Sequence, residues 1–144
     1  NFNGYWNNSE ATRQAIMPDG WFRSGDLGYL DADGYLFIVD RKKDIIIRGG
    51  ENISSKEVEG VLLGIPAVAD VAVVAAPDDR MGEVVRACVV LKLGTALSLD
   101  DVRAHFAQQG IAKQKTPERL TIVDELPRNA SGKILKHELR NLPL

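Results

Sequence analysis

With 144 residues, 44% hydrophobic and 26% charged, the chain is long enough to bury a core and has the composition of an ordinary globular protein. A formal net charge of −2 argues against a nucleic-acid-binding protein that acts through a broad positive field. The longest apolar runs, such as residues 71–76, are far shorter than the roughly 20 residues that a membrane-spanning helix needs.

The first forty residues predict short elements separated by turn residues. A helix is expected over residues 9–16, and Pro18-Asp19-Gly20 ends it. Short β-like runs follow, with a hairpin turn at residues 31–34 between the last two. The expected strands are residues 21–23, 27–30 and 35–39. A charged stretch, residues 40–44, then separates this sheet from the apolar run 45–47 and is typical of a joint.

From about residue 41 onward the pattern predicts a compact α+β domain, and it becomes clearer from Ser54. Ser54 and Glu57 form a capping-box pattern before a helix, and Ser98 with Asp101 does the same before a second helix that Gly110 ends. Apolar spacing predicts a last helix through Leu139. The expected strands are residues 68–76, 84–91 and 119–123. We therefore expect a central, mainly antiparallel sheet flanked by helices, together with a short hairpin.

The single cysteine and the first residue bear on the protein's setting. Cys88 lies in an apolar run, so no internal disulfide can form, and we expect a small core residue in a reducing compartment. The chain begins with Asn1 and not with methionine, which predicts a piece of a longer protein.

The stretch PRNASGK, residues 127–133, combines small flexible residues with one cation, Lys133. Ser131 and Gly132 would let the backbone approach a ligand closely, and a helix following directly would add amide donors, so the segment suits an oxyanion such as phosphate. It is not a Walker P-loop, because Pro127 stands where that motif needs glycine. The alternative is a solvated surface lysine beside a helix cap.

Three stretches in order, residues 20–41, 40–59 and 127–136, resemble the C-terminal part of the adenylate-forming superfamily. This superfamily comprises acyl-CoA synthetases, the adenylation domains of peptide synthetases, and luciferases. The likeness runs along essentially the whole chain. It implies that residues 1–40 are the closing strands of a large AMP-binding N-terminal domain and that residues 41–144 are a small, mobile C-terminal domain.

The resemblance also implies roles for single residues. Asp26 matches the aspartate that binds the ribose hydroxyls of ATP and AMP, and Arg41 matches an arginine that reaches the same nucleotide. Without the family context, Asp26 would be a turn residue and Arg41 an exposed charge. Lys43 matches the hinge about which the small domain rotates, and the alternative is one more charge in a charged turn. Gly49 and Gly50 would line the tunnel for the pantetheine arm of coenzyme A, although a tight turn explains the same glycines.

In the family, Lys133 would be the catalytic lysine, bridging the carboxylate substrate and the α-phosphate of ATP during adenylation. The expected protein is therefore an ATP-dependent acyl-CoA ligase acting on a fatty or aryl acid. Its expected ligands are ATP, Mg²⁺, coenzyme A and a small carboxylic acid. The missing N-terminal domain is an expected partner, and the chain alone is expected to be inactive.

The alternatives to this interpretation are part of a peptide-synthetase adenylation domain, or a non-catalytic α+β interaction module. Coenzyme A is preferred over a carrier-protein arm because of the Gly-Gly-Glu-Asn stretch, residues 49–52. No metal-ligating spacing is present in the sequence. The expected location is the cytoplasm, and peripheral attachment of the full-length enzyme to a membrane is left open.

Overall fold

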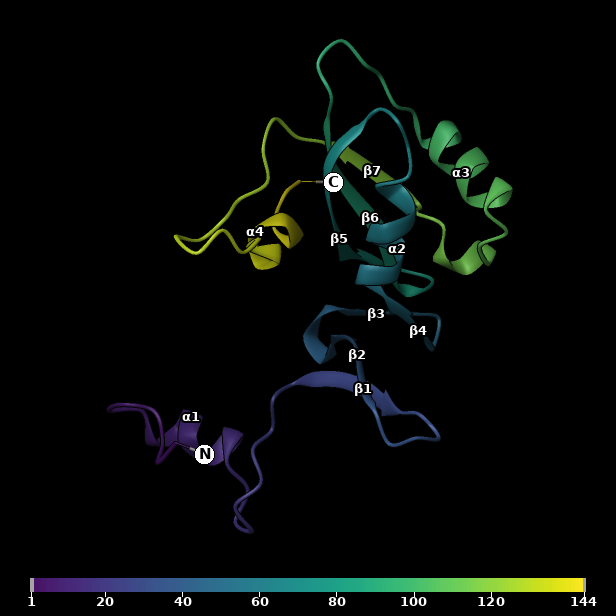
Figure 1. Cartoon of the computed structure of the whole chain (residues 1–144). Helices are drawn as coiled ribbons and strands as arrows, with labels where there is room; N and C mark the ends of the chain where they lie inside the picture. Colours follow the sequence, from purple (N-terminus) through teal and green to yellow (C-terminus); the bar gives the residue numbers. More distant parts are fainter. Residues whose placement is uncertain (1, 144) are drawn as a thin grey trace. The chain divides into compact units, whose positions relative to one another are not determined.

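The computed structural model describes residues 2–143, and the chain divides into two compact units, Asn1–Lys43 and Asp44–Leu144. Figure 1 labels their helices and strands in chain order. The division falls immediately after Lys43.

The first unit contains one short helix and one hairpin. Helix α1 spans Ser9–Ala15, and the side chain of Asn8 caps it by accepting a hydrogen bond from the Ala11 amide. Strands β1 (Asp26–Leu30) and β2 (Leu36–Arg41) pair antiparallel. The Asp31 carboxylate accepts the amides of Asp33 and Tyr35 and so closes the turn that the sequence predicts.

The strand predicted over residues 21–23 was wrong. In the structure, Phe22 makes only an isolated antiparallel bridge with Ile16. A turn occupies the intervening residues, in which the amide of Met17 donates to the carbonyl of Trp21. Aromatic and apolar residues made this segment look like a strand, but a single bridge leaves no neighbouring strand to extend the pairing.

Large apolar side chains remain exposed on both faces of the β1–β2 hairpin. A two-stranded hairpin has too little area to form a core of its own, so these side chains have no apolar layer to pack against in this unit. The exposed residues are Leu27, Tyr29, Leu30, Tyr35, Leu36, Phe37, Ile38 and Val39.

The second unit is built on one sheet with the strand order β4-β3-β6-β5, and β7 also pairs with β6. Every pairing is antiparallel except that of β6 with β7. Strand β6 is the centre of the sheet, since it pairs with β3, β5 and β7, and β5 lies at the edge. The predicted mainly antiparallel sheet is therefore confirmed. The strands are β3 (Ile45–Arg48), β4 (Glu51–Ser54), β5 (Val68–Asp78), β6 (Gly82–Leu91) and β7 (Arg119–Ile122).

Local side-chain caps start the two longer helices at the predicted residues. Helix α2 spans Ser55–Leu62, and the Ser54 hydroxyl accepts the amide of Glu57. Helix α3 spans Leu99–Gln108, and Ser98 and Asp101 form the complete capping box. The other helical elements are η1 (Lys42–Asp44), η2 (Lys113–Lys115) and α4 (Lys136–Arg140).

Helices cover both faces of the sheet of the second unit (Figure 1). Helices α2 and α3 bury one face, where Val102 and Phe106 are fully buried. Burying a side chain of this size stabilises the fold by about 1.5–3 kcal/mol. Helix α4 covers the other face, where Leu139 packs with Cys88. Cys88 is fully buried, which confirms its predicted core position, and burial raises the pKa of its thiol.

Within residues 2–143, no helix combines the length and the apolar character needed to cross a bilayer.

Candidate functional site

Asp26 and Arg41 lie opposite each other at the open end of the β1–β2 hairpin. The Arg41 Nε atom donates to Asp26 Oδ1 at 2.8 Å, and the two side chains are 46% and 26% exposed. The Ser24 hydroxyl accepts the amide of Asp26 at 3.1 Å and so orients the start of β1. The strand register thus brings together two side chains that are distant in sequence, and it leaves the pair open to solvent.

A hollow of about 520 Å³ lies in the first unit at this end of the hairpin. Ser24, Gly25, Arg41, Lys42 and Lys43 line it, so three of its five lining residues carry a positive charge. Such a surface favours an anionic ligand beside the Asp26 carboxylate, which can accept hydroxyl hydrogen bonds.

Lys133 is exposed on the second limb of a small hairpin, directly after the turn at residues 130–132, and not at the start of a helix. Arg128 and Ile134 form the bridge that closes this hairpin, and the amide of Asn129 donates to the carbonyl of Lys133 at 2.9 Å. We call residues 128–134 the lysine hairpin. Gly132 has a φ of 81°, a left-handed conformation that glycine adopts without strain.

The prediction that a helix follows Lys133 directly was wrong. The Asn129 carboxamide oxygen accepts the amides of Ser131 and Lys133, at 3.1 and 2.8 Å. Helix α4 begins only at Lys136 and is five residues long. An Asn side chain that bonds to nearby backbone amides favours a turn over a helix. The lysine hairpin therefore presents its cation from a hydrogen-bonded turn.

Gly49 and Gly50 form the turn between β3 and β4, with φ values of 55° and 89°. The Gly49 amide donates to the carbonyl of Met81 at 2.9 Å, and a Cβ atom on Gly49 would lie 2.5 Å from Met81 Cε. A Cβ atom on Gly50 would meet nothing within 4 Å. The positive φ angles explain both glycines as turn residues, and the space beside Gly50 is open.

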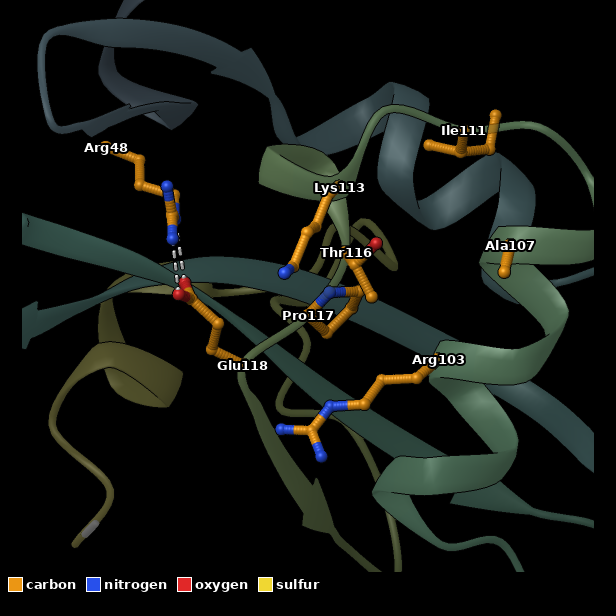
Figure 2. Close-up of a pocket in the computed structure, with 8 residues that line it drawn as sticks. All are labelled: Arg48, Arg103, Ala107, Ile111, Lys113, Thr116, Pro117 and Glu118. Atoms are coloured by element: carbon orange, nitrogen blue, oxygen red, sulfur yellow. Dashed lines mark hydrogen bonds and ion pairs between the residues drawn. The ribbon is translucent and has the colours of Figure 1, made fainter.

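A pocket of about 570 Å³ in the second unit contains Arg48, the residue directly before this turn. Figure 2 shows its lining residues, which come from β3, α3, η2 and the segment that leads into β7. Arg48 forms two hydrogen bonds with Glu118, at 3.0 and 2.7 Å, and these bonds raise the pKa of the guanidinium above its ordinary value. Arg103 and Lys113 add two further positive charges to the lining.

Sequence reasoning missed this pocket. Arg48, Arg103 and Lys113 are far apart along the chain, and no motif links them. The one available sequence signal was the position of Arg48 directly before the glycine pair, and it would have predicted only Arg48 as a pocket residue.

The structure assigns the predicted site residues to the two units. Asp26, Arg41 and Lys43 belong to the first unit, with Lys43 as its last residue. Lys133 and the Gly49–Gly50 turn belong to the second unit.

The model of the AMP-binding enzyme C-terminal domain family matches residues 57–133. The chain belongs to this family. The match confirms the resemblance seen in the three sequence stretches, and the α+β fold of the second unit is the one expected from it.

Individual relatives extend the likeness of this AMP-binding enzyme C-terminal domain to nearly the whole chain. Over 140 residues it is 50% identical to the medium-chain fatty-acid–CoA ligase of Escherichia coli (strain K12), a match that covers 96% of this chain and 25% of that ligase. The chain thus spans about a quarter of the length of the curated relatives it matches.

Two solved structures are similar as well. ATP-bound MatB from Rhodopseudomonas palustris has a TM-score of 0.87 and 40% identity, and the match covers 96% of this chain and 27% of MatB. The o-succinylbenzoate CoA synthetase MenE from Bacillus subtilis, in complex with its acyl-adenylate intermediate, has a TM-score of 0.86 and 40% identity. That match covers 98% of this chain and 28% of MenE.

Proposed function

We propose that this AMP-binding enzyme C-terminal domain is part of an ATP-dependent acyl-CoA ligase. In the first step, a carboxylate attacks the α-phosphorus of ATP, which releases pyrophosphate and forms an acyl-adenylate. In the second step, the thiol of coenzyme A attacks the acyl carbonyl, which releases AMP and forms the thioester. The substrate class is a fatty or aryl carboxylic acid, and the predicted location is the cytoplasm.

One observation carries this proposal: the chain is 50% identical, over nearly its whole length, to a protein named as a CoA ligase. The neighbouring solved structures hold ATP in one case and an acyl-adenylate in the other. These two structures therefore contain the starting nucleotide and the product of the first step.

The exposed hairpin of the first unit supports the assignment of residues 1–40 to a larger N-terminal domain. The apolar side chains on both faces of β1 and β2 are typical of strands that are buried on both sides in an α/β sheet. Further strands and helices of such a domain would supply the missing layers.

Asp26 and Arg41 are the proposed nucleotide-binding residues. The Asp26 carboxylate would accept the ribose hydroxyls, and the guanidinium of Arg41 both orients that carboxylate and reaches the nucleotide. The cation-lined hollow of Ser24, Gly25 and residues 41–43 favours the phosphate side of the same ligand.

Lys43 is the proposed hinge about which the second unit rotates between the two half-reactions. It lies in the single 3₁₀ turn η1, and the boundary between the compact units follows it directly. A rotation of one unit against the other requires only a few backbone dihedral angles to change at such a point.

The pocket beside the Gly49–Gly50 turn favours coenzyme A as the thiol acceptor. The open space at Gly50 suits the thin pantetheine arm, and the cations of the pocket suit the phosphates of the nucleotide part of coenzyme A. A carrier protein presents the same arm without the adenosine 3′-phosphate. The cations therefore support the ligase over the second candidate, a peptide-synthetase adenylation domain, although Arg48 is paired with Glu118 and Arg103 with Asp100.

Mg²⁺ is expected to accompany ATP in the proposed reaction. Among the residues that the structure describes, no three His, Cys, Asp or Glu side chains gather closely enough to ligate a metal ion. We assign Mg²⁺ no step.

The proposed function is tested on the full-length protein with a panel of fatty and aryl acids. We expect ATP–pyrophosphate exchange that depends on the acid, followed by thioester formation with coenzyme A. Exchange without any thioester, unless a phosphopantetheinylated carrier protein is supplied, would favour the peptide-synthetase alternative. The absence of exchange with every acid would favour the non-catalytic module and contradict the proposal.

Replacing Asp26 with alanine should weaken nucleotide binding in both half-reactions. Loss of hydrogen bonds to a charged acceptor predicts a KM for ATP that is roughly 10- to 100-fold higher, and a similarly weaker affinity for AMP. Titration calorimetry with AMP and steady-state kinetics of the full-length protein measure both effects. Asp33→Ala, in the turn at the other end of the same hairpin, is the control and should leave both values unchanged.

Replacing Lys113 with alanine should impair only the second half-reaction. The loss of one cation from the pocket predicts a KM for coenzyme A about tenfold higher, an effect that weakens as salt is added. Lys115→Ala is the matched control, because Lys115 pairs with Glu57 and does not line the pocket. An unchanged KM for coenzyme A would show that the pocket does not bind it.

A further inference from the structure

Arg128, on the first limb of the lysine hairpin, fixes the hairpin to the sheet of the second unit. One guanidinium nitrogen of Arg128 donates to the carbonyl of Gly132 at 2.6 Å, and the other forms an ion pair with Asp70 of β5 at 2.6 Å. The same side chain therefore holds the hairpin closed and attaches it to the sheet.

Helix α4 attaches the second limb of the hairpin. Lys136 Nζ lies 2.8 Å from Glu59 Oε1 and donates to the Ser55 hydroxyl at 2.7 Å. Glu59 Oε1 also accepts the amide of Val73 at 2.8 Å. The side chains of Lys136 and Glu59 are only 16% and 19% exposed, so water screens this pair weakly. The start of α4 thus has a defined place on α2 and β5.

The end of α4 is tied to the first residue of the unit. Arg140 Nη2 and Asp44 Oδ1 lie 2.8 Å apart, and the Asp44 side chain is only 14% exposed. Asp44 follows the proposed hinge residue Lys43 directly, whereas Arg140 is 96 positions farther along the chain. This ion pair therefore links the residue after the hinge directly to α4, the helix that follows the lysine hairpin.

We propose that Arg140 and Asp44 are positioning residues for acyl-adenylate formation. Their ion pair ties the residue after the hinge to α4, so that Lys133 keeps one position relative to the pivot when the unit rotates. This inference rests on the proposed function and on the role of Lys133 in it. Neither residue needs to touch the substrate.

The second half-reaction should not depend on this ion pair. The Gly49–Gly50 turn is joined to Asp44 by the backbone of β3 itself, and β4 and β6 hold that strand in the sheet. The lysine hairpin and α4 also contact β5 and α2, through Arg128–Asp70 and Lys136–Glu59, but the ion pair of Arg140 joins α4 directly to Asp44. Loss of this pair should therefore loosen the placement of Lys133 relative to the hinge and leave the glycine turn where it is.

The test uses Arg140→Ala and Asp44→Asn in the full-length protein. A displacement of about 1 Å in a reacting group can cost up to about 100-fold in rate, so we expect acyl-adenylate formation to fall roughly 10- to 100-fold. Thioester formation from supplied acyl-adenylate and coenzyme A should stay close to the wild-type rate. Arg140→Lys keeps the positive charge and should restore part of the first rate.

Glu57→Gln is the matched control, since it removes the carboxylate of an ion pair that lies away from α4 and should leave both rates unchanged. Hydrogen exchange gives a readout that does not depend on activity. In both test variants, the amides of residues 129–135 should exchange faster, while those of β5 and β6 stay protected. Asp44→Asn changes few atoms and keeps the test valid if Arg140→Ala does not fold.

Two results would overturn the inference: an equal fall in both half-reactions, or an unchanged rate of adenylation together with unchanged exchange in the hairpin. A failure of the proposed function is a different result. In that case the wild-type protein itself forms no acyl-adenylate, whereas the exchange experiment still reports whether Arg140 and Asp44 hold the hairpin.

Discussion

Replacing Lys133 with alanine is expected to slow acyl-adenylate formation by roughly 10²–10³-fold, the usual cost of removing a group that stabilises charge in the transition state. Negative charge builds between the carboxylate and the α-phosphate as the bond forms, and an exposed ammonium group on a hydrogen-bonded turn can be presented to it. ATP–pyrophosphate exchange in the full-length protein measures this step.

The second half-reaction separates this role from a structural one. Thioester formation from supplied acyl-adenylate should remain close to the wild-type rate in Lys133→Ala, because that step makes no new bond at phosphorus. Lys92→Ala, which removes another exposed lysine of the same unit, is the control and should leave both steps unchanged. An equal loss of both steps in Lys133→Ala would mean that the lysine maintains the fold.

Replacing Arg86 with alanine is expected to lower the free energy of unfolding by about 3 kcal/mol, or the melting temperature by about 10 °C. Arg86 lies in β6 and is 2% exposed. Its guanidinium donates to the Thr121 hydroxyl at 2.9 Å and to the carbonyls of Leu142 and Pro143 at 2.9 and 2.7 Å. These bonds fasten the segment after α4 to the sheet.

Two effects oppose each other at this position. A buried guanidinium carries a desolvation cost, which the substitution removes. The substitution also removes three hydrogen bonds from a charged donor and leaves a cavity under α4, and these losses are larger. Urea denaturation of the 144-residue chain, followed by circular dichroism, measures the net result.

Arg119→Ala is the matched control for Arg86→Ala. Arg119 is the register partner of Arg86 on the neighbouring strand, but its side chain is 30% exposed and donates to the carbonyl of Pro77. Such a partly exposed contact contributes little to stability. Similar losses in the two variants would show that the bonds of Arg86 to the C-terminal segment are not what stabilises the fold.

Much of the second unit could be predicted from local signals. Ser54 and Ser98 start their helices as expected, because a hydroxyl that accepts a free amide of the first turn acts within four residues of sequence. The paired strands β5 and β6 were predicted nearly to their ends, since long β-branched runs divided by a turn leave few other arrangements.

The lysine hairpin shows where local patterns mislead. Ile134 and Leu139 have helical spacing, but residues 133–135 pair with residues 127–129 across the hairpin and so are not free to begin the helix earlier. Helix propensity and apolar periodicity do not predict this choice between helix and hairpin. The choice depends on which hydrogen bonds the whole turn can make at once.

The sequence alone was sufficient for the family, the α+β class and the identity of the candidate residues Asp26, Arg41 and Lys133, because these depend on residue types in a fixed order. Their spatial relations depended on the folded chain. Strand register places Arg41 against Asp26, and packing of α4 brings Arg140 to Asp44 across 96 positions. The cations of the pocket at Arg48 likewise converge from β3, α3 and η2. Contacts between residues this far apart depend on how the strands and helices pack, and hydrophobic burial drives that packing. No local sequence pattern therefore predicts them.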